Sequence, residues 1–380
     1  MPLLGEALPA FPWDSLAAVR TRANEHPGGI VDLSVGTPVD PTPDVVRDAL
    51  VAAADSPGYP TTQGTPALRE AIVAWFARRR GVHGLTPDAV LPTIGSKELV
   101  ALLPALLGLG VGDVVVHPRV AYPTYDVGAR LAGAEPFPAD ATTAVGPGPV
   151  RLVWLNSPSN PTGRVLGVEH LAKVVAWARA RGAVVASDEC YAELAWEEPW
   201  ASEGVPSILD ERVNDGSHEG LLALYSVSKQ SNLAGYRAAF AAGDPALIER
   251  LLAVRKHAGM IMPGPVQAAL TAALTDDAHV AEQRERYRSR RQVLRAACEV
   301  AGLEVAPESE AGLYLWASLR DQPGAPCRAI AAALAERGIL VAPGEFYGPL
   351  GAHHVRIALT ASDERIEAAA ARLAAGPLRV

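Results

Sequence analysis

The sequence contains little of what marks a secreted, membrane-bound or metal-binding protein. Only three of its 380 residues are cysteines, Cys190, Cys298 and Cys327, and they lie far apart. This odd, scattered set forms neither a disulfide framework nor a metal-ligand pattern, and it is typical of a protein in the reducing cytoplasm. No apolar run approaches the roughly 18 residues that span a membrane. The N-terminal residues MPLLGEALPAFPWDSL place no basic segment ahead of an apolar core, so we expect no secretory signal.

Positive charge, and lysine in particular, is also scarce. The net charge of −8 argues against a general nucleic-acid surface. Of the 34 basic residues only four are lysines, so each well-placed lysine is informative. What is present is a chain with 49% apolar residues, long enough for two domains or for one large domain with an appendage.

The most informative lysine is Lys229, in the stretch LALYSVSKQSNLAGYR at 222–237. A short apolar run predicts a buried strand, and the small polar residues after it predict a loop. A lysine whose pKa is lowered there can form a Schiff base with a carbonyl compound. Ser226, Ser228 and Arg237 are suited to holding a phosphate beside it. The alternative is a solvated surface lysine, and this stretch alone leaves both interpretations open.

Other polar residues also follow predicted strands. We expect strands at 30–35, 90–94, 114–117, 152–155, 183–187 and 222–225, and helices at 15–24, 43–54, 66–80 and 168–181. From residue 90 to 240 the pattern is strand, loop and helix repeated. This predicts an α/β fold with an open, mostly parallel sheet, whose ligands bind at the carboxyl ends of the strands.

Four residues at such strand ends are candidates for a binding site. Gly36 offers a backbone N–H for a carboxylate, or lies in an ordinary turn. Ser96 begins a helix and marks an anion site, or is a plain N-cap. Tyr122 suits stacking on a flat ring, or belongs to the core or rim. Asp188 ends a buried apolar strand, so its carboxylate must be paired or hydrogen-bonded there, for example by a protonated ring nitrogen.

After the repeated region we expect helices at 245–258 and 265–274 and a long charged helix at 278–302. Beyond it, helices at 326–337 and 362–374 and strands at 303–305, 313–317, 340–341 and 355–359 predict a smaller α+β unit. The charged residues at 282–295 predict a solvated helix face. Arg356 lies within a strand of apolar neighbours, where it either faces outward or is buried and paired. If buried, it is a two-pronged carboxylate receptor.

Three motifs occur together in one family. They are S-x-S-K-x-x-x-x-x-G-x-R at 226–237, N-x-P-x-N-P-T-G at 156–163 and D-E-x-Y at 188–191. These motifs resemble those of the class I/II aminotransferases, which are fold-type I enzymes dependent on pyridoxal 5′-phosphate. The resemblance runs from Gly36 to Arg356. The stretches GSKE, SVSKQSNLAGYR and MPGPVQAAL are most similar to the actinobacterial N-succinyldiaminopimelate aminotransferases, although no single substrate-specific residue carries that closer match.

The resemblance implies an architecture and an assembly. It implies a large pyridoxal-phosphate-binding domain at 38–278 with a mostly parallel seven-stranded sheet between helices, and a small C-terminal domain at 279–380. Residues 1–37 would form an arm and part of the small domain. It also implies a homodimer in the cytoplasm, with no nucleic acid, membrane or metal as partner.

The resemblance also implies roles for individual residues. Lys229 would hold the cofactor aldehyde as a Schiff base and then carry the proton between substrate and cofactor. Asp188 would pair with the pyridine nitrogen. Asn160 and Tyr191 would bond the phenolic oxygen of the ring, and Tyr122 would stack on the ring face.

The remaining implied roles concern the phosphate and the substrate. The phosphate would be held by Ser96, the backbone N–H of Lys97, Ser226 and Arg237. Tyr59 of the partner subunit would complete this phosphate site. Arg356 would bind the α-carboxylate, helped by the N–H of Gly36. The Lys97 side chain has three alternatives: the phosphate, an ion pair with Glu98, or a distal substrate carboxylate.

We therefore expect an aminotransferase that moves an amino group between an amino acid and a 2-oxo acid, with N-succinyl-LL-2,6-diaminopimelate and 2-oxoglutarate as the expected pair in lysine and diaminopimelate biosynthesis. An aspartate-, aromatic- or alanine-type aminotransferase and a β-C–S lyase share the same central residues. A transcriptional regulator with an aminotransferase-like sensor would carry a DNA-binding domain before it. Because the family pattern starts near residue 30, we do not expect one.

Overall fold

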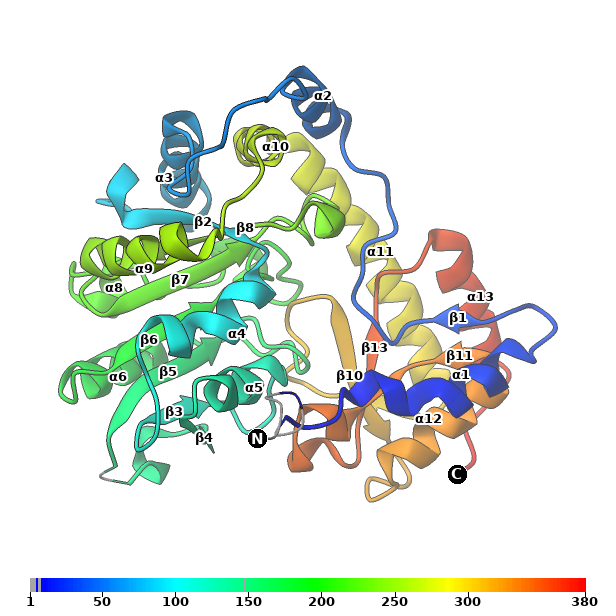
Figure 1. Cartoon of the computed structure of the whole chain (residues 1–380). Helices are drawn as coiled ribbons and strands as arrows, with labels where there is room; N and C mark the ends of the chain where they lie inside the picture. Colours follow the sequence, from blue (N-terminus) through cyan, green and yellow to red (C-terminus); the bar gives the residue numbers. More distant parts are fainter. Residues whose placement is uncertain (1–4, 6–7, 147) are drawn as a thin grey trace.

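A sheet of seven strands organises the larger part of the chain (Figure 1). The computed structural model describes residue 5, residues 8–146 and residues 148–380. The strand order is β2-β8-β7-β6-β5-β3-β4, and β8 alone runs antiparallel to its neighbours. The strands are β2 (Val90–Ile94), β3 (Val114–His117), β4 (Glu135–Pro138), β5 (Val150–Asn156), β6 (Val184–Asp188), β7 (Leu221–Ser226) and β8 (Ala238–Gly243). The expected mostly parallel seven-stranded sheet is confirmed.

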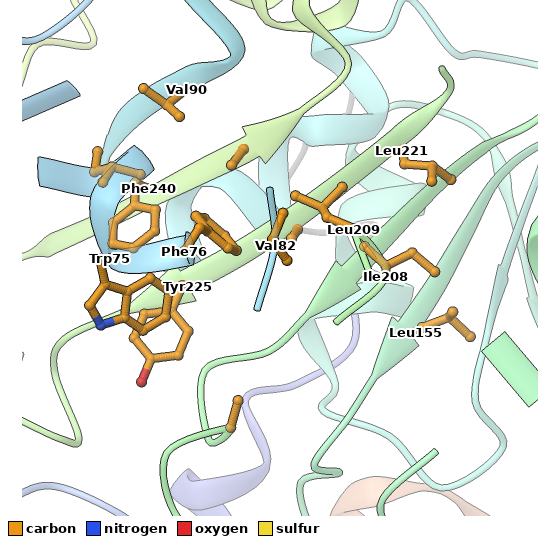
Figure 2. Close-up of a cluster of buried hydrophobic side chains, with 14 of the residues drawn as sticks. Trp75, Phe76, Val82, Val90, Leu155, Ile208, Leu209, Leu221, Tyr225 and Phe240 are labelled. Carbon is orange, nitrogen blue, oxygen red and sulfur yellow. The ribbon is translucent and has the colours of Figure 1, made fainter. Parts of the chain in front are cut away.

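Alternating side chains of each central strand enter two different cores. In β7, Leu222 and Leu224 pack on one face of the sheet, while Ala223 and Tyr225 pack on the other, as the two-residue period of a strand requires. On the second face Trp75 lies 4.3 Å from the ring of Tyr225 and 5.7 Å from that of Phe240, between ring centroids (Figure 2). The sheet is therefore buried on both faces, as the continuous apolar strands predicted.

Helices cover both faces of this sheet. They are α2 (Asp44–Ala52), α3 (Pro66–Arg80), α4 (Ser96–Leu106), α5 (Thr124–Leu131), α6 (Val168–Arg179), α7 (Trp200–Glu203), α8 (Glu211–Asn214), α9 (Pro245–Ala258) and α10 (Gly264–Thr275). The predicted helix at 66–80 is confirmed to the residue. Thr65 caps its first turn by accepting from the N–H of Leu68, and Gly81 ends it in the left-handed conformation.

The smaller part is built from both ends of the chain. Its four-stranded antiparallel sheet has the order β12-β13-β10-β9, and β1 pairs with β11 in a separate parallel pair. The elements are β1 (Val31–Asp32), β9 (Leu303–Val305), β10 (Tyr314–Leu319), β11 (Ile339–Leu340), β12 (Ala342–Pro343), β13 (Val355–Ala358), α1 (Ala17–Asn24), α11 (Ala278–Val300), α12 (Cys327–Glu336) and α13 (Asp363–Leu373). Short 3-10 helices lie at Pro12–Leu16, Pro87–Ala89, Thr142–Ala144, Ala234–Tyr236, Gly344–Tyr347 and Pro349–Gly351. No described helix is both long and apolar enough to cross a membrane.

One sequence expectation needs correction. The charged face of α11 is not wholly solvated, because Arg290 and Arg291 are only 3% and 7% exposed. Arg290 is buried because it pairs with Asp40, over 2.6 Å between Nη2 and Oδ1, where α11 meets the segment before α2. The helix α5 and the strands β4 and β8 were not among the expected elements.

Candidate active site

One cavity of about 460 Å³ lies between the carboxyl edge of the large sheet and the smaller part of the chain. We call it the central cavity. Because parallel strands end at the same sheet edge, residues far apart in the sequence, from Ser96 to Arg237, meet there. Its lining includes every predicted site residue except Tyr59: Gly36, Ser96, Lys97, Tyr122, Asn160, Asp188, Tyr191, Ser226, Lys229, Arg237 and Arg356. Tyr59 is fully exposed and lies outside the cavity that its own chain forms.

Lys229 projects its amino group into this cavity from the loop after β7. Its Nζ donates to the carbonyl oxygen of Gly36, and no carboxylate of a described residue lies within 4.0 Å of it. Burial lowers the pKa of Lys229, and the nearby charges of Arg356 and Arg237 act in the same direction. A larger share of the amine is therefore neutral and nucleophilic than for an exposed lysine.

Asp188 ends β6 on the opposite wall and is 7% exposed. Its Oδ2 accepts from the hydroxyl of Tyr125 over 2.9 Å, and its Oδ1 accepts from the backbone N–H of Cys190 over 3.2 Å. Burial nevertheless raises the pKa of Asp188 above its usual value. A cation placed against this carboxylate would offset the cost of burying its charge.

The start of α4 and the loop before β8 form an anion cup. Gly95, with φ 78°, precedes the first turn of α4, and Arg237, with φ 56°, brings its guanidinium against it. A Cβ at Gly95 would lie 2.0 Å from Nη2 of Arg237, so the cup needs glycine there. Ser226 adds a hydroxyl that donates to Ser228 over 2.8 Å. A helix N-terminus, an arginine and serine hydroxyls together suit a phosphate.

Arg356 is buried on β13 with its guanidinium facing the cavity. It donates from Nη1 to Oδ1 of Asn160 over 2.9 Å and from Nη2 to the carbonyl of Ser34 over 2.7 Å. Its Cζ lies 3.9 Å from the ring centroid of Tyr314. Its Nε is buried without a partner among the described residues. The prediction that a buried Arg356 is held inside the site agrees with this geometry, and an incoming carboxylate would neutralise its charge.

Sequence reasoning missed three residues of this site. Tyr125 holds Asp188, and it lies on α5, which was not among the expected helices. Tyr314 lies 3.3 Å from Tyr191 between hydroxyl oxygens. Burial alone would raise the pKa of the Tyr314 phenol, but the charges of Arg356 and Lys229 bring it below its usual value.

The third is Asn156, which organises the loop before Asn160. Its amide nitrogen donates to the carbonyls of Pro158 and Asp188, over 3.1 and 2.9 Å, and its Oδ1 accepts from the N–H of Asn160 over 2.7 Å. This asparagine is the first residue of the N-x-P-x-N motif, so the motif could have identified it as a site residue.

The central cavity thus presents an amine, a buried carboxylate, an anion cup and a guanidinium that pairs with no carboxylate of a described residue. This set fits a flat, phosphate-bearing aldehyde with a ring nitrogen, namely pyridoxal 5′-phosphate, together with an amino acid.

Comparison with known proteins agrees with this chemistry. Residues 29–373 match the family model described as aminotransferase class I and II. The chain is 61% identical over 367 residues to a probable aminotransferase of Mycobacterium tuberculosis, covering 97% of this chain and 85% of the relative. It is 60% identical over 366 residues to the 4-dedimethylamino-4-oxo-anhydrotetracycline transaminase OxyQ of Streptomyces rimosus, covering 96% and 99%. Among solved structures, a probable N-succinyldiaminopimelate aminotransferase from Thermus thermophilus superposes with a TM-score of 0.85 at 31% identity, covering 96% and 100%.

Proposed function

The chain belongs to aminotransferase class I and II and is a pyridoxal 5′-phosphate-dependent aminotransferase, and from this premise we propose that it moves an amino group between N-succinyl-LL-2,6-diaminopimelate and 2-oxoglutarate in lysine and diaminopimelate biosynthesis. The observation that carries the reaction type is the meeting of Lys229, Asp188, the anion cup and Arg356 in one cavity. The similarity to a probable N-succinyldiaminopimelate aminotransferase supports the substrate.

In this proposal Lys229 has two tasks. Its amine would hold the cofactor through the aldehyde group, and during the reaction it would move a proton to and from the α-carbon of the substrate. The carbonyl of Gly36, which accepts from Nζ, holds the amine near the substrate-binding Arg356. When bound, the cofactor supplies an electron-accepting ring. Asp188 keeps its ring nitrogen protonated, and Tyr125 keeps Asp188 in place.

The other predicted residues orient the two bound molecules. The phosphate is held by Ser96, the N–H of Lys97, Ser226 and Arg237. Tyr122 lies against the face of the cofactor ring. Since Oδ1 of Asn160 accepts from Arg356, its Nδ2 is the atom left to donate to the phenolic oxygen of the ring, beside Tyr191. Arg356 and the N–H of Gly36 bind the α-carboxylate.

We also propose that the active unit is a homodimer in the cytoplasm, with Tyr59 of the partner subunit completing the phosphate site. The full exposure of Tyr59, on the loop between α2 and α3, supports this, because a large aromatic side chain at a loop tip is available to a second copy. The domain limits at residues 37/38 and 278/279 stay predictions.

A second candidate substrate is a large polycyclic ketone, because OxyQ, at 60% identity over nearly its whole length, carries the name of such a reaction. A donor and acceptor panel separates the two. The purified enzyme should convert N-succinyl-LL-2,6-diaminopimelate with 2-oxoglutarate at a higher kcat/KM than aspartate, alanine or aromatic amino acids. Turnover only of the polycyclic ketone would support the second candidate, and release of thiol from cysteine conjugates would indicate a lyase.

A further inference from the structure

The residues around Lys229 form one tight turn. The backbone N–H of Ser231 donates to the carbonyl of Val227 over 3.0 Å, and Lys229 lies at the centre of the five residues that this bond encloses. Val227 directly follows β7, whereas Ser231 belongs to no helix or strand. The sheet therefore fixes the first end of the turn, and the second end needs another support if the amine is to keep its place in the central cavity.

That support comes from α11 (Figure 1). Nε2 of His279, in the first turn of this helix, lies 2.7 Å from Oγ of Ser231. Ser231 is 0% exposed and His279 is buried, so water does not compete for this bond. A helix that belongs to the smaller part of the chain thus contacts the second end of the turn.

Two further side chains on the same face of α11 contact the same stretch. Gln283 and Tyr287 follow His279 at intervals of four residues, which places all three on one side of the helix. Oε1 of Gln283 accepts from Nδ2 of Asn232 over 2.8 Å, and the hydroxyl of Tyr287 donates to the carbonyl of Lys229 over 3.4 Å. The helix therefore holds residues 229, 231 and 232 together.

The imidazole of His279 is itself fixed by Asp276, just before α11. Nδ1 of His279 lies 2.5 Å from Oδ2 of Asp276, which also accepts from the backbone N–H of His279 over 3.1 Å. The hydrogen bond from His279 lowers the pKa of Asp276, so the carboxylate is charged at neutral pH. A carboxylate only accepts, so Nδ1 carries the hydrogen and donates in a charge-assisted bond.

The hydroxyl of Ser231 is oriented from the other side. It accepts from Nε2 of Gln230 over 3.3 Å, and Oε1 of that glutamine accepts from the hydroxyl of Tyr225 over 2.5 Å. The described residues offer the hydroxyl hydrogen of Ser231 no acceptor other than Nε2 of His279. The hydrogen bonds thus run in one direction, from Tyr225 on β7 to Asp276 before α11. We call Ser231, His279 and Asp276 the polar chain.

The same order of groups activates the nucleophile of a serine hydrolase, but the surroundings exclude that role here. A surface cavity of about 320 Å³ is lined by Asp276 and His279 and not by Ser231. Because the hydroxyl of Ser231 is buried, a substrate in that cavity does not reach it. The polar chain can therefore act only by holding the turn.

We infer that the polar chain keeps the amine of Lys229 in place for proton transfer by fixing the second end of the turn at 227–231. Its members are then positioning residues for the reaction. The inference rests on the proposed function, because that function gives Lys229 the proton transfer. Displacing a reacting group by about 1 Å costs up to about a hundredfold in rate, so a loosened turn should slow the reaction without weakening the binding of the substrate.

The first test separates rate from binding in the half-reaction of the holoenzyme with L-glutamate, followed by stopped-flow absorbance. Ser231→Ala should lower the rate constant at saturation by between about tenfold and a hundredfold. The apparent Kd for glutamate should stay unchanged, because Arg356 lies on β13. Asp276→Asn should give a smaller decrease, because a neutral acceptor remains for Nδ1 of His279.

Asp277→Asn is the matched control. This neighbouring carboxylate pairs with Arg78 on α3, over 2.9 Å, so its loss disturbs the start of α11 without touching the polar chain. It should keep the wild-type rate constant. Wild-type rate constants in Ser231→Ala and Asp276→Asn would overturn the inference. If Ser231→Ala does not fold, the partly exposed Asp276→Asn decides alone.

The second test distinguishes the two hydrogen bonds of His279. A glutamine amide can occupy the position of Nε2, and an asparagine amide can occupy that of Nδ1. His279→Gln should therefore keep a partner for Ser231, whereas His279→Asn should keep only the bond to Asp276. Since the bond to Ser231 is the one that reaches the turn, His279→Asn should be the slower variant. Equal rate constants in the two variants would contradict the inference.

The third test observes the turn without turnover, by hydrogen exchange of the holoenzyme and mass spectrometry. The amides of 229–232 should exchange faster in Ser231→Ala and Asp276→Asn than in wild type or Asp277→Asn, because the turn opens more often. Unchanged exchange there would overturn the inference. If wild type shows no cofactor absorbance change with L-glutamate or N-succinyl-LL-2,6-diaminopimelate, the proposed function is wrong instead, and the exchange rates still decide whether the polar chain holds the turn.

Discussion

Arg356 donates from Nη1 to Oδ1 of Asn160 over 2.9 Å, and this bond joins the two parts of the chain at the central cavity. Arg356 comes from β13 of the smaller part, and Asn160 follows β5 of the large sheet. The guanidinium that would receive the substrate carboxylate is therefore aligned by a residue that would bond the cofactor ring. The proposed substrate and cofactor sites therefore share this hydrogen bond.

Replacing Arg356 should consequently disturb substrate binding first. Arg356→Ala removes the two-pronged receptor, and we expect the amino-acid KM to rise by an amount equivalent to about 2–5 kcal/mol of binding. Arg356→Lys should recover only part of this, because an ammonium cannot bind a carboxylate in two-pronged geometry. Steady-state kinetics with the preferred donor measure both, and an unchanged KM would assign the carboxylate to another residue.

Lys229→Ala should abolish transamination, because the proposed role gives this amine both the cofactor linkage and the proton transfer. Borohydride treatment followed by mass spectrometry should find the reduced cofactor adduct on wild type and on Lys173→Ala, but not on Lys229→Ala. Normal turnover by Lys229→Ala would contradict the central role of the lysine.

Asp188→Asn should retain the cofactor and slow proton abstraction by orders of magnitude, because an amide does not keep the ring nitrogen protonated. Stopped-flow absorbance of the half-reaction measures the rate, and equilibrium dialysis measures the bound cofactor. Tyr125→Phe removes one of the hydrogen bonds to Asp188 and should give a smaller decrease. An Asp188→Asn enzyme as fast as wild type would exclude the ring-nitrogen role.

The lowered pKa of Lys229 also predicts how the cofactor-free protein responds to pH. At pH values between the lowered pKa of Lys229 in the folded protein and its ordinary value of 10.5, the unfolded chain binds more protons than the folded protein does. The free energy of unfolding therefore rises with pH in this range. Lys229→Met should therefore unfold at a higher temperature than wild type near pH 7, and the difference should shrink towards pH 10. The exposed Lys256→Met is the control, and a constant difference across this range would contradict the lowered pKa.

Gly95→Ala tests the anion cup. The new Cβ would lie 2.0 Å from Nη2 of Arg237 and displace the guanidinium, so we expect a weaker affinity for the cofactor. Gly81→Ala is a matched control, because Gly81 also has positive φ, at 62°, but no atom within 4 Å of the added Cβ. Both changes should lower stability by about 1 kcal/mol or more, because alanine is strained at positive φ, and only Gly95→Ala should raise the cofactor Kd. Equal cofactor affinity of the two variants would contradict the cup.

Short stretches of the sequence were sufficient to predict five of the seven strands of the large sheet, their ligand edge and the residues gathered there. The two-residue and 3.6-residue periods are local properties, and in a parallel sheet the end of each strand fixes which edge its next residue meets. Asp188, Lys229 and Arg237 could therefore be predicted from motifs alone. The mostly parallel sheet followed from the same local patterns, whereas its seven strands followed from the resemblance of the motifs to the family.

The tertiary structure alone decided which of several local alternatives holds. Glu98 forms an ion pair with Arg255, which is 157 positions away in the sequence, rather than with the adjacent Lys97. Tyr125 reaches Asp188 from α5, which was not among the expected helices, and the face of α11 predicted to be solvated buries Arg290 against Asp40. Such pairings depend on which elements pack together, and packing depends on the whole chain. The sequence motifs therefore determined the reaction class, and the tertiary structure determined which side chains surround the site.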